Sequence, residues 1–318
     1  MEKQQKKKIS TGKKILISVL SIFIVIILGV GGYAYYLYHS VQKTAVTMHK
    51  PIDREKSEKR TEEIVFEKRE PISVLLMGVD ARSGDRGRSD SLIVLTVNPI
   101  DKSMKMVSIP RDTRTEIVGK GFQDKINHAY AFGGPEMTIN TVENFLDIPI
   151  DYFVQVNMES FKDIVDAVGG VTVNNGFEFS SSGYTFNKGQ VNLNGDQALA
   201  YARMRYEDPR GDFGRQDRQR QIIMAVINKG ASFSSLTNSG EILSAIGKNI
   251  QTNMTFDEMV DIQKNYKEAR HSLEQYMVKG SGTKLDGIYY YIVPENERTS
   301  LSSTLKEHLH VSETVTKK

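Results

Sequence analysis

An uncharged segment at residues 15–38 constrains this chain more than any other feature. Six lysines precede it, its first part is almost wholly apolar, and four tyrosines stand near its end. A helix that crosses a bilayer needs roughly 20 apolar residues, with lysines on its cytoplasmic side and aromatic residues at the interfaces. We predict an uncleaved signal anchor. The alternative is a cleaved signal peptide, although the apolar part of such a peptide usually spans only about 7–15 residues.

The anchor divides the chain into four predicted parts. These are a cytoplasmic basic tail (1–14), a transmembrane signal anchor (15–38), an extracellular stalk (39–70) and an extracytoplasmic catalytic domain (71–318). Lysines before the span place the N-terminus in the cytoplasm, so we expect a single-pass type II protein of the cell membrane.

The charge of the remaining chain argues against nucleic acid as a partner. The chain has 42 basic and 39 acidic residues, and without the six lysines and one glutamate of the tail 36 basic residues face 38 acidic ones. A nucleic-acid-binding surface would require an excess of basic residues. The chain has no cysteine, which excludes disulfides and thiol chemistry. An extracellular protein without disulfides fits the surface of a Gram-positive bacterium.

Short apolar runs alternate with helical patterns beyond the stalk. We predict strands at residues 72–79, 92–97, 104–109, 152–156, 171–173 and 289–293, and helices at residues 135–145, 161–168, 196–203, 255–269 and 300–308. Thr255 and Glu258 form a capping-box pattern at the start of one of these helices. This mixture predicts one α/β domain with helices on both faces of a central sheet.

The residues of the first of two arginine-rich clusters lie at the ends of the first three predicted strands. Asp80 follows one strand and Asp90 precedes the next, so the two carboxylates and substrate phosphate oxygens are candidates to bind Mg²⁺. Arg88 lies between them, and Arg111 follows a third strand and a proline. Arginine holds phosphate oxygens through a planar, permanently charged fork. The alternative is a charged surface hairpin and turn in which these residues merely pair with one another.

The second cluster begins at the end of a predicted helix. Arg203 and Arg205 stand there, where the helix dipole alone would favour a cation. A helical stripe follows in which cationic residues are succeeded by apolar ones along the helix axis. Its positions are spaced i, i+3, i+4, i+7 and i+11 and hold Arg215, Arg218, Gln219, Ile222 and Val226. Such a stripe suits a ligand with an anionic head and a hydrocarbon tail. The alternative is a helix whose first turn simply leaves the core.

The familiar hydrolase and kinase motifs are absent from the sequence. It contains no Gly-x-Ser-x-Gly elbow, no Walker loop and no His-Glu-x-x-His. His128 is a candidate acid or base, although a single histidine is more often structural.

Taken in order, these motifs resemble those of the LytR–CpsA–Psr family of cell-wall ligases over residues 72–228. They are Gly-Val-Asp-x-Arg, Arg-Ser-Asp-Ser, Ser-Ile-Pro-Arg-Asp-Thr, Ile-Asn-His-Ala-Tyr, Gly-Gly-Val, Leu-Asn-Gly-Asp-Gln-Ala-Leu-Ala-Tyr-Ala-Arg-Met-Arg and Asp-Phe-Gly-Arg-Gln-x-Arg-Gln. The similarity is greatest to members that attach wall teichoic acid.

The resemblance implies a three-layer α/β/α domain that binds a polyprenyl diphosphate-linked glycopolymer. Such an enzyme transfers the polymer, with one phosphate, to a sugar hydroxyl of peptidoglycan, and acts beside the lipid bilayer that holds its donor. Asp80 and Asp90 match the family's metal-site carboxylates, for Mg²⁺ or Mn²⁺. The head-group positions match Arg88, Arg111, Arg203, Arg205, Arg215 and Gln219, to which the helical stripe adds Arg218.

We expect Arg88, Asp90, Arg111 and Arg215 to be catalytic, and Ile222 and Val226 to line the prenyl tunnel. Asp90 or Asp112 is a candidate to accept the proton of the acceptor hydroxyl. Two other functions remain open: a hydrolase of the lipid diphosphate, and a non-catalytic, membrane-anchored polymer binder or regulator.

Overall fold

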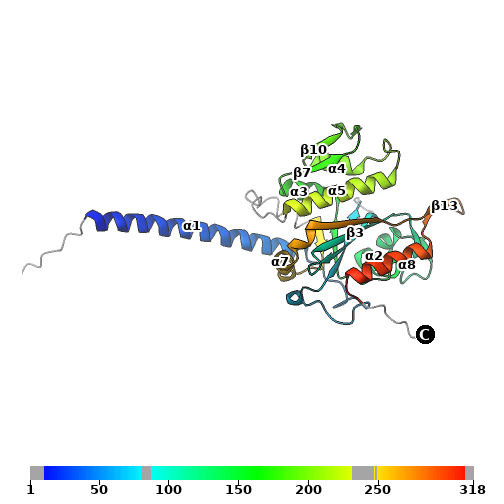
Figure 1. Cartoon of the computed structure of the whole chain (residues 1–318), viewed down its shortest axis with the longest axis horizontal. Helices are drawn as coiled ribbons and strands as arrows, with labels where there is room; N and C mark the ends of the chain where they lie inside the picture. Colours follow the sequence, from blue (N-terminus) through cyan, green and yellow to red (C-terminus); the bar gives the residue numbers. More distant parts are fainter. Residues whose placement is uncertain (1–10, 81–86, 231–246, 248, 312–318) are drawn as a thin grey trace, which may run out of the picture. The chain divides into compact units, whose positions relative to one another are not determined.

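The computed structural model describes residues 11–80, 87–230, 247 and 249–311, with side chains from residue 28 onward (Figure 1). The chain separates into two compact units, residues 1–44 and 45–318. The first unit contains most of helix α1 (Thr11–Met48). No helix in the fully described part of the chain combines the length and apolar character that crossing a membrane requires, and residues 15–27 of the predicted anchor lie outside that part.

A six-stranded mixed sheet forms the centre of the second unit. Its strand order is β11 (Ile250–Thr252), β6 (Tyr152–Val156), β1 (Ile72–Val79), β2 (Ser89–Asn98), β3 (Ser103–Ile109) and β12 (Ser272–Met277). Strand β2 runs antiparallel to both β1 and β3, and β11 runs antiparallel to β6, whereas β6 pairs with β1 and β12 with β3 in parallel. The predicted α/β domain with a central mixed sheet is therefore confirmed.

Alternation along the strands gives the sheet two apolar faces. On β1, Leu75 and Met77 enter one core cluster, whereas Ile72 and Val74 enter another on the opposite face. Helices α2 (His128–Leu146) and α8 (Glu295–His308) cover the first face. Three elements cover the second: α5 (Asp212–Gly230), α7 (Phe256–Asn265) and the 3-10 helix η3 (Lys267–His271).

A third apolar cluster lies on the outer side of α5. It is built from α3 (Met158–Ala167), β7 (Val171–Asn175), β8 (Phe179–Ser181), β9 (Tyr184–Phe186), β10 (Gly189–Leu193) and α4 (Gly195–Arg203). Figure 1 shows α3, α4, β7 and β10 gathered beside α5. Helix α5 therefore packs between this cluster and the sheet, and its two flanks face different surroundings.

Two hairpins extend from the ends of the sheet. One consists of β4 (Arg114–Glu116) and β5 (Gln123–Lys125), and the other of β13 (Ser281–Leu285) and β14 (Ile288–Ile292). An isolated bridge between Thr113 and Tyr291 joins them.

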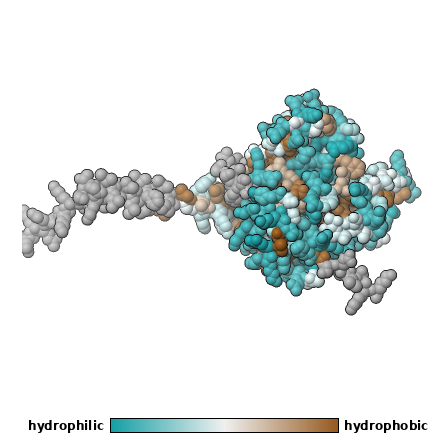
Figure 2. Space-filling view, in the orientation of Figure 1, coloured by the Kyte–Doolittle hydropathy of each residue, from teal (hydrophilic) through white to brown (hydrophobic). Residues whose placement is uncertain are grey.

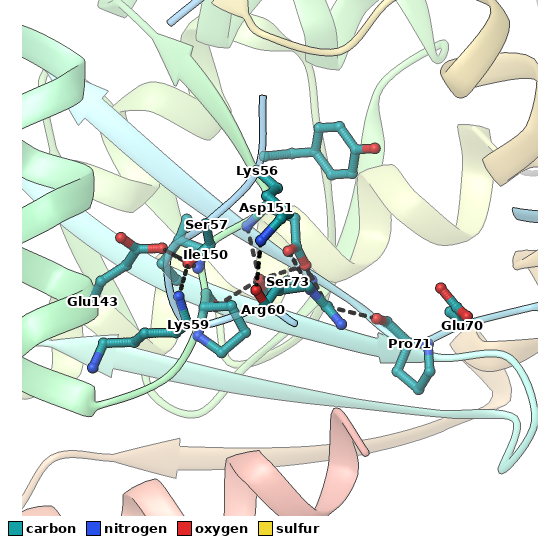
Figure 3. A network of polar contacts seen from close by, with 12 residues as sticks. Lys56, Ser57, Lys59, Arg60, Glu70, Pro71, Ser73, Glu143, Ile150 and Asp151 are labelled. Atoms are coloured by element: carbon teal, nitrogen blue, oxygen red, sulfur yellow. Dashed lines mark hydrogen bonds and ion pairs between the residues drawn. The ribbon is translucent and has the colours of Figure 1, made fainter. Parts of the chain in front are cut away.

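Residues 45–70 form part of the second compact unit, residues 45–318. Figure 3 shows how this segment is attached. Arg60 pairs with Asp151 through two nitrogens at 2.6 and 2.7 Å, and Asp151 also accepts hydrogen bonds from Ser73. Phe66, in the 3-10 helix η1 (Phe66–Lys68), is buried in the second cluster. The ion pairs that attach this segment therefore join it to residues that are distant in the sequence.

Candidate functional site

The two arginine clusters meet at one end of the sheet. Arg111 follows β3 and donates from Nη1 to Asp90 Oδ1 at 2.9 Å. Arg215 lies in the first turn of α5, with Nη2 2.7 Å from Asp212 Oδ1. The charges of Asp90 and Asp212 each act on both arginines, and the charge of Arg111 acts on Arg215. Two cations and two carboxylates therefore share one electrostatic environment.

The positive charge of the Arg215 guanidinium is only partly neutralised by its neighbours. Its side chain is 14 % exposed, and no hydrogen-bond partner of Nε is present among the described residues. Burial, only partly offset by Asp212, lowers the pKa of Arg215, and the nearby Arg111 lowers it further. A buried guanidinium that is incompletely neutralised favours the binding of an anion. The site is therefore suited to phosphate oxygens.

A β-bulge places Asp90 at this site. Gly78 pairs with Ser91 and Val79 with Ser89, so Asp90 is the extra residue between them. Bulges of this kind redirect a side chain near functional sites. The backbone amides of Asp80 and Asp90 both donate to the carbonyl oxygen of Arg88, at 3.3 and 3.1 Å. The two predicted metal-site residues are thus brought together at the level of the backbone.

Asp80 and Asp90 are the residues that would hold a divalent ion here. Arg111 contacts Oδ1 of Asp90, which leaves Oδ2 as the oxygen through which this residue would contribute. No group of three or more His, Asp or Glu that could hold a metal occurs in the described part of the chain. A pair of carboxylates is nevertheless compatible with Mg²⁺, which keeps several waters and uses substrate phosphate oxygens as further ligands.

Arg88, Arg203 and Arg205 are exposed, and the charge of Arg205 also acts on Arg215. Gln219, one turn beyond Arg215, accepts a hydrogen bond from the Ser91 hydroxyl at 3.0 Å. This bond attaches α5 to β2 beside Asp90. Residues 81–86 of the first cluster lie outside the described residues.

Arg218 does not join this group. Its side chain is 3 % exposed, its Nη1 is 2.6 Å from Asp208 Oδ2, and its Nε donates to the carbonyl of Tyr201 at 3.1 Å. The guanidinium also lies 5.4 Å from the centre of the Phe179 ring. Although the sequence grouped Arg218 with the phosphate-binding arginines, the structure places it inside the third cluster.

The same division applies to the predicted tunnel residues. Ile222 is 1 % exposed and Val226 half-buried, and both pack in the third cluster, one and two turns beyond Arg218. The sheet-facing flank of α5 instead presents Ile223 and Ile227, which are half-buried against the second cluster. The single stripe in the sequence therefore divides into two neighbouring rows on α5. Arg218, Ile222 and Val226 face the third cluster, whereas Arg215 and Gln219 lie in the row that continues to Ile223 and faces the sheet.

Two aspartates, one in α5 and one in the loop before it, were not among the predicted site residues. Asp212 pairs with Arg215, and Asp208 is held against Gly214 so closely that a Cβ on Gly214 would lie 1.8 Å from Asp208 Oδ2. The spacing of Asp212 and Arg215, three positions apart at a helix start, was the available signal.

Known proteins are similar to this chain both in sequence and in architecture. The model of the LytR_cpsA_psr family matches residues 35–307. A curated relative from Bacillus subtilis (strain 168), the polyisoprenyl-teichoic acid–peptidoglycan teichoic acid transferase TagU, is 55 % identical over 309 residues, or 97 % of this chain and 99 % of the relative.

Two solved structures have the same fold. The crystal structure of B. subtilis TagU matches with a TM-score of 0.62 and 56 % identity, over 76 % of this chain and 97 % of that one. The LytR-CPS2A-psr family protein YwtF (TagT) with bound octaprenyl pyrophosphate lipid matches with a TM-score of 0.67 and 29 % identity, over 83 % and 100 %. With a family match that spans most of its length, this chain belongs to the LytR_cpsA_psr family.

Proposed function

We propose that this protein transfers a teichoic acid-type glycopolymer, with one phosphate, from a polyprenyl diphosphate carrier to a sugar hydroxyl of peptidoglycan. The observation that carries the proposal is the meeting of Arg111 and Arg215, more than a hundred positions apart, around Asp90 and Asp212. The relative named a polyisoprenyl-teichoic acid–peptidoglycan transferase, more than half identical over nearly the whole chain, supports the choice of donor and acceptor.

The reaction requires little covalent help from the protein. The acceptor oxygen forms a bond to the phosphorus next to the polymer, and the bond from that phosphorus to the bridging oxygen of the diphosphate breaks. The electron pair leaves with polyprenyl phosphate. Phosphoryl transfer depends mainly on positioning and on stabilising the charge of the oxygens. Arg111 and Arg215 supply preorganised positive charge for this purpose.

The proton of the acceptor hydroxyl goes to a carboxylate in this proposal. Asp90 and Asp112 are the candidates, since both contact Arg111, through Nη1 at 2.9 Å and Nε at 3.8 Å. Asp112 also contacts Lys125 Nζ at 2.7 Å. Asp80 and Asp90 would hold Mg²⁺ or Mn²⁺, which when bound neutralises charge on the diphosphate oxygens.

The sheet-facing flank of α5 is our proposed seat for the start of the prenyl chain. Ile223 and Ile227 lie one and two turns beyond Gln219, and they pack half-buried against the same cluster as Leu76 and Val154 of the sheet, which are also half-buried. These side chains retain apolar surface that a hydrocarbon would cover, at about 25 cal/mol per Å². Ile222 is already packed and has little surface left to offer.

The N-terminal segment completes the proposal. We propose that residues 15–38 anchor the protein in the cell membrane with its catalytic domain outside, because the donor is itself held in the bilayer. A tethered enzyme then meets its substrate in the plane of the membrane.

Transfer and hydrolysis are separated by one experiment. The full-length protein in liposomes receives a defined polyprenyl diphosphate-linked polymer, with or without peptidoglycan oligomers, in Mg²⁺. We expect polymer to become linked to the oligomer through a phosphodiester and polyprenyl phosphate to be released with it. Release of free polymer at the same rate with and without the oligomer would replace the transferase by a hydrolase.

A further inference from the structure

Three aromatic side chains are exposed beside the phosphate site. Phe122, Phe132 and Tyr289 are 46 %, 38 % and 46 % exposed, and they come from the β4–β5 hairpin, from α2 and from β14. Phe122 and Phe132 meet edge to face, with ring centres 5.8 Å apart, and His128 lies edge-on to Phe132 at 6.2 Å. We call this surface, together with Tyr290, the aromatic shelf.

Polar contacts make the shelf continuous from one hairpin to the other. His128 Nδ1 is 2.7 Å from Asp124 Oδ2, and the Tyr290 hydroxyl donates to Asp124 Oδ1 at 3.3 Å. Lys125 Nζ lies 6.0 and 5.9 Å from the ring centres of Tyr289 and Tyr290. Asp124 therefore joins His128 to Tyr290, and Lys125 lies near the rings of both Tyr289 and Tyr290.

The shelf is attached directly to the arginine site. Lys125 Nζ contacts Asp112 Oδ1 at 2.7 Å, and Asp112 is the neighbour of Arg111 in sequence and in space. The amide of Tyr291 donates to the carbonyl of Asp112 at 2.8 Å, and its ring meets that of Phe213, in the first turn of α5, at 5.9 Å. A molecule lying on the shelf thus has one end beside Arg111 and Arg215.

The exposed rings and the balanced charge of the shelf favour one class of ligand over others. Exposed aromatic rings offer flat apolar faces of partial negative charge, which suit the C–H faces of sugar rings. Four acidic residues accompany its four cations: Asp112, Glu116, Asp124 and Asp286 against Arg114, Lys120, Lys125 and Lys284. A balanced surface holds no advantage for a polyanion such as the donor polymer. Figure 2 shows hydrophobic and hydrophilic residues mixed at the end of the domain where Figure 1 labels β13.

We infer that the aromatic shelf binds the glycan strand of the acceptor peptidoglycan, with sugar rings stacked on Tyr289, Phe132 and Phe122 and the reacting hydroxyl directed toward Arg111. The inference rests on the proposed function for the identity of the acceptor. It assigns to the acceptor a surface separate from the residues that hold the donor diphosphate.

The test compares a shelf variant with a matched control in full-length protein in liposomes. Tyr289→Ala combined with Phe132→Ala removes two exposed rings, whereas Tyr184→Ala removes a ring that is 36 % exposed on β9, distant from the shelf in the fold. We expect the double variant to raise the KM for a peptidoglycan oligosaccharide at least tenfold and to leave the KM for the lipid-linked donor unchanged. The control keeps both values. An unchanged acceptor KM in the double variant overturns the inference.

Direct binding keeps this test independent of catalysis. Titration calorimetry with the peptidoglycan oligosaccharide, with a soluble teichoic acid fragment and with zwitterionic lipid vesicles should show loss of oligosaccharide binding alone in the double variant. Loss of only teichoic acid or vesicle binding would mean that the shelf serves the donor polymer or the membrane, and the inference would fall. If the wild-type protein binds the oligosaccharide through the shelf but transfers no polymer, the inference about the shelf stands and the proposed transferase function is wrong.

Discussion

Arg111 Nη1 lies 2.9 Å from Asp90 Oδ1, so that a guanidinium at the end of β3 is paired with a carboxylate in the bulge at the start of β2. Both side chains are partly exposed, at 25 % and 32 %. The pair is therefore oriented in advance but remains accessible to a ligand.

Replacement of Arg111 by alanine should abolish most of the transfer activity without unfolding the domain. Removal of one preorganised group that stabilises transition-state charge typically costs about 10²–10³ in kcat. Steady-state transfer assays on the purified variant check this. Arg298→Ala, which removes a half-buried arginine that pairs with Glu295 in α8, serves as the control and should retain full activity. Equal activity in both variants would exclude Arg111 from the reaction.

Arg215 and Arg218, three positions apart on α5, should separate activity from stability. Arg215→Ala removes positive charge from the phosphate site, so kcat should fall about 10²–10³-fold while the thermal midpoint changes little. Arg218→Ala leaves Asp208, whose side chain is 0 % exposed, without its buried partner, which should cost about 3–5 kcal/mol of unfolding free energy. Chemical denaturation and transfer assays on both variants provide the measurements. A loss of stability in Arg215→Ala together with a loss of activity alone in Arg218→Ala would contradict the site described above.

The Arg60–Asp151 pair should be a major contributor to the attachment of residues 45–70 (Figure 3). The two side chains are 9 % and 4 % exposed, so Arg60→Ala leaves a buried carboxylate and should lower the unfolding free energy by about 3–5 kcal/mol. Lys59→Ala is the matched control, because its partner Asp147 is 54 % exposed and such a pair contributes about 0–1 kcal/mol. Similar urea midpoints for the two variants would show that the buried pair has no special role.

His308 should make the domain less stable in acid. It lies between Thr96 Oγ1 at 2.7 Å and Ser103 Oγ at 2.9 Å, and burial, with nearby Lys105, lowers its pKa to about 4. Below the ordinary value of about 6.5 the unfolded chain takes up a proton that the folded protein excludes. Stability therefore falls as the pH drops from about 6.5 toward 4, by about 2 kcal/mol at pH 5.

Urea unfolding at pH 7.5 and pH 5 measures this loss. His308→Gln keeps polar atoms but cannot titrate, so its loss between the two pH values should be smaller than that of the wild type by about that amount. An equal loss in both proteins would exclude His308 as the cause.

Local patterns in the sequence sufficed for much of the framework. Strand β1 begins and ends at the residues that its apolar run predicted, and Thr255 caps α7 through Glu258 as the capping box indicated. The order of the sheet was not readable, because pairing depends on contacts between distant segments. Strands β11 and β12, which form the two edges, are not among the strands that the sequence predicted.

The sequence by itself determined which residue types are available: two arginine clusters, the aspartates near them and the apolar periodicity of each element. Only the tertiary structure decided their partners. Arg215 and Arg218 share one helical stripe, yet one faces the phosphate site and the other Asp208, because α5 packs between two different layers. Periodicity reports which face of a helix a residue occupies. What covers that face depends on segments that fold against it from elsewhere in the chain.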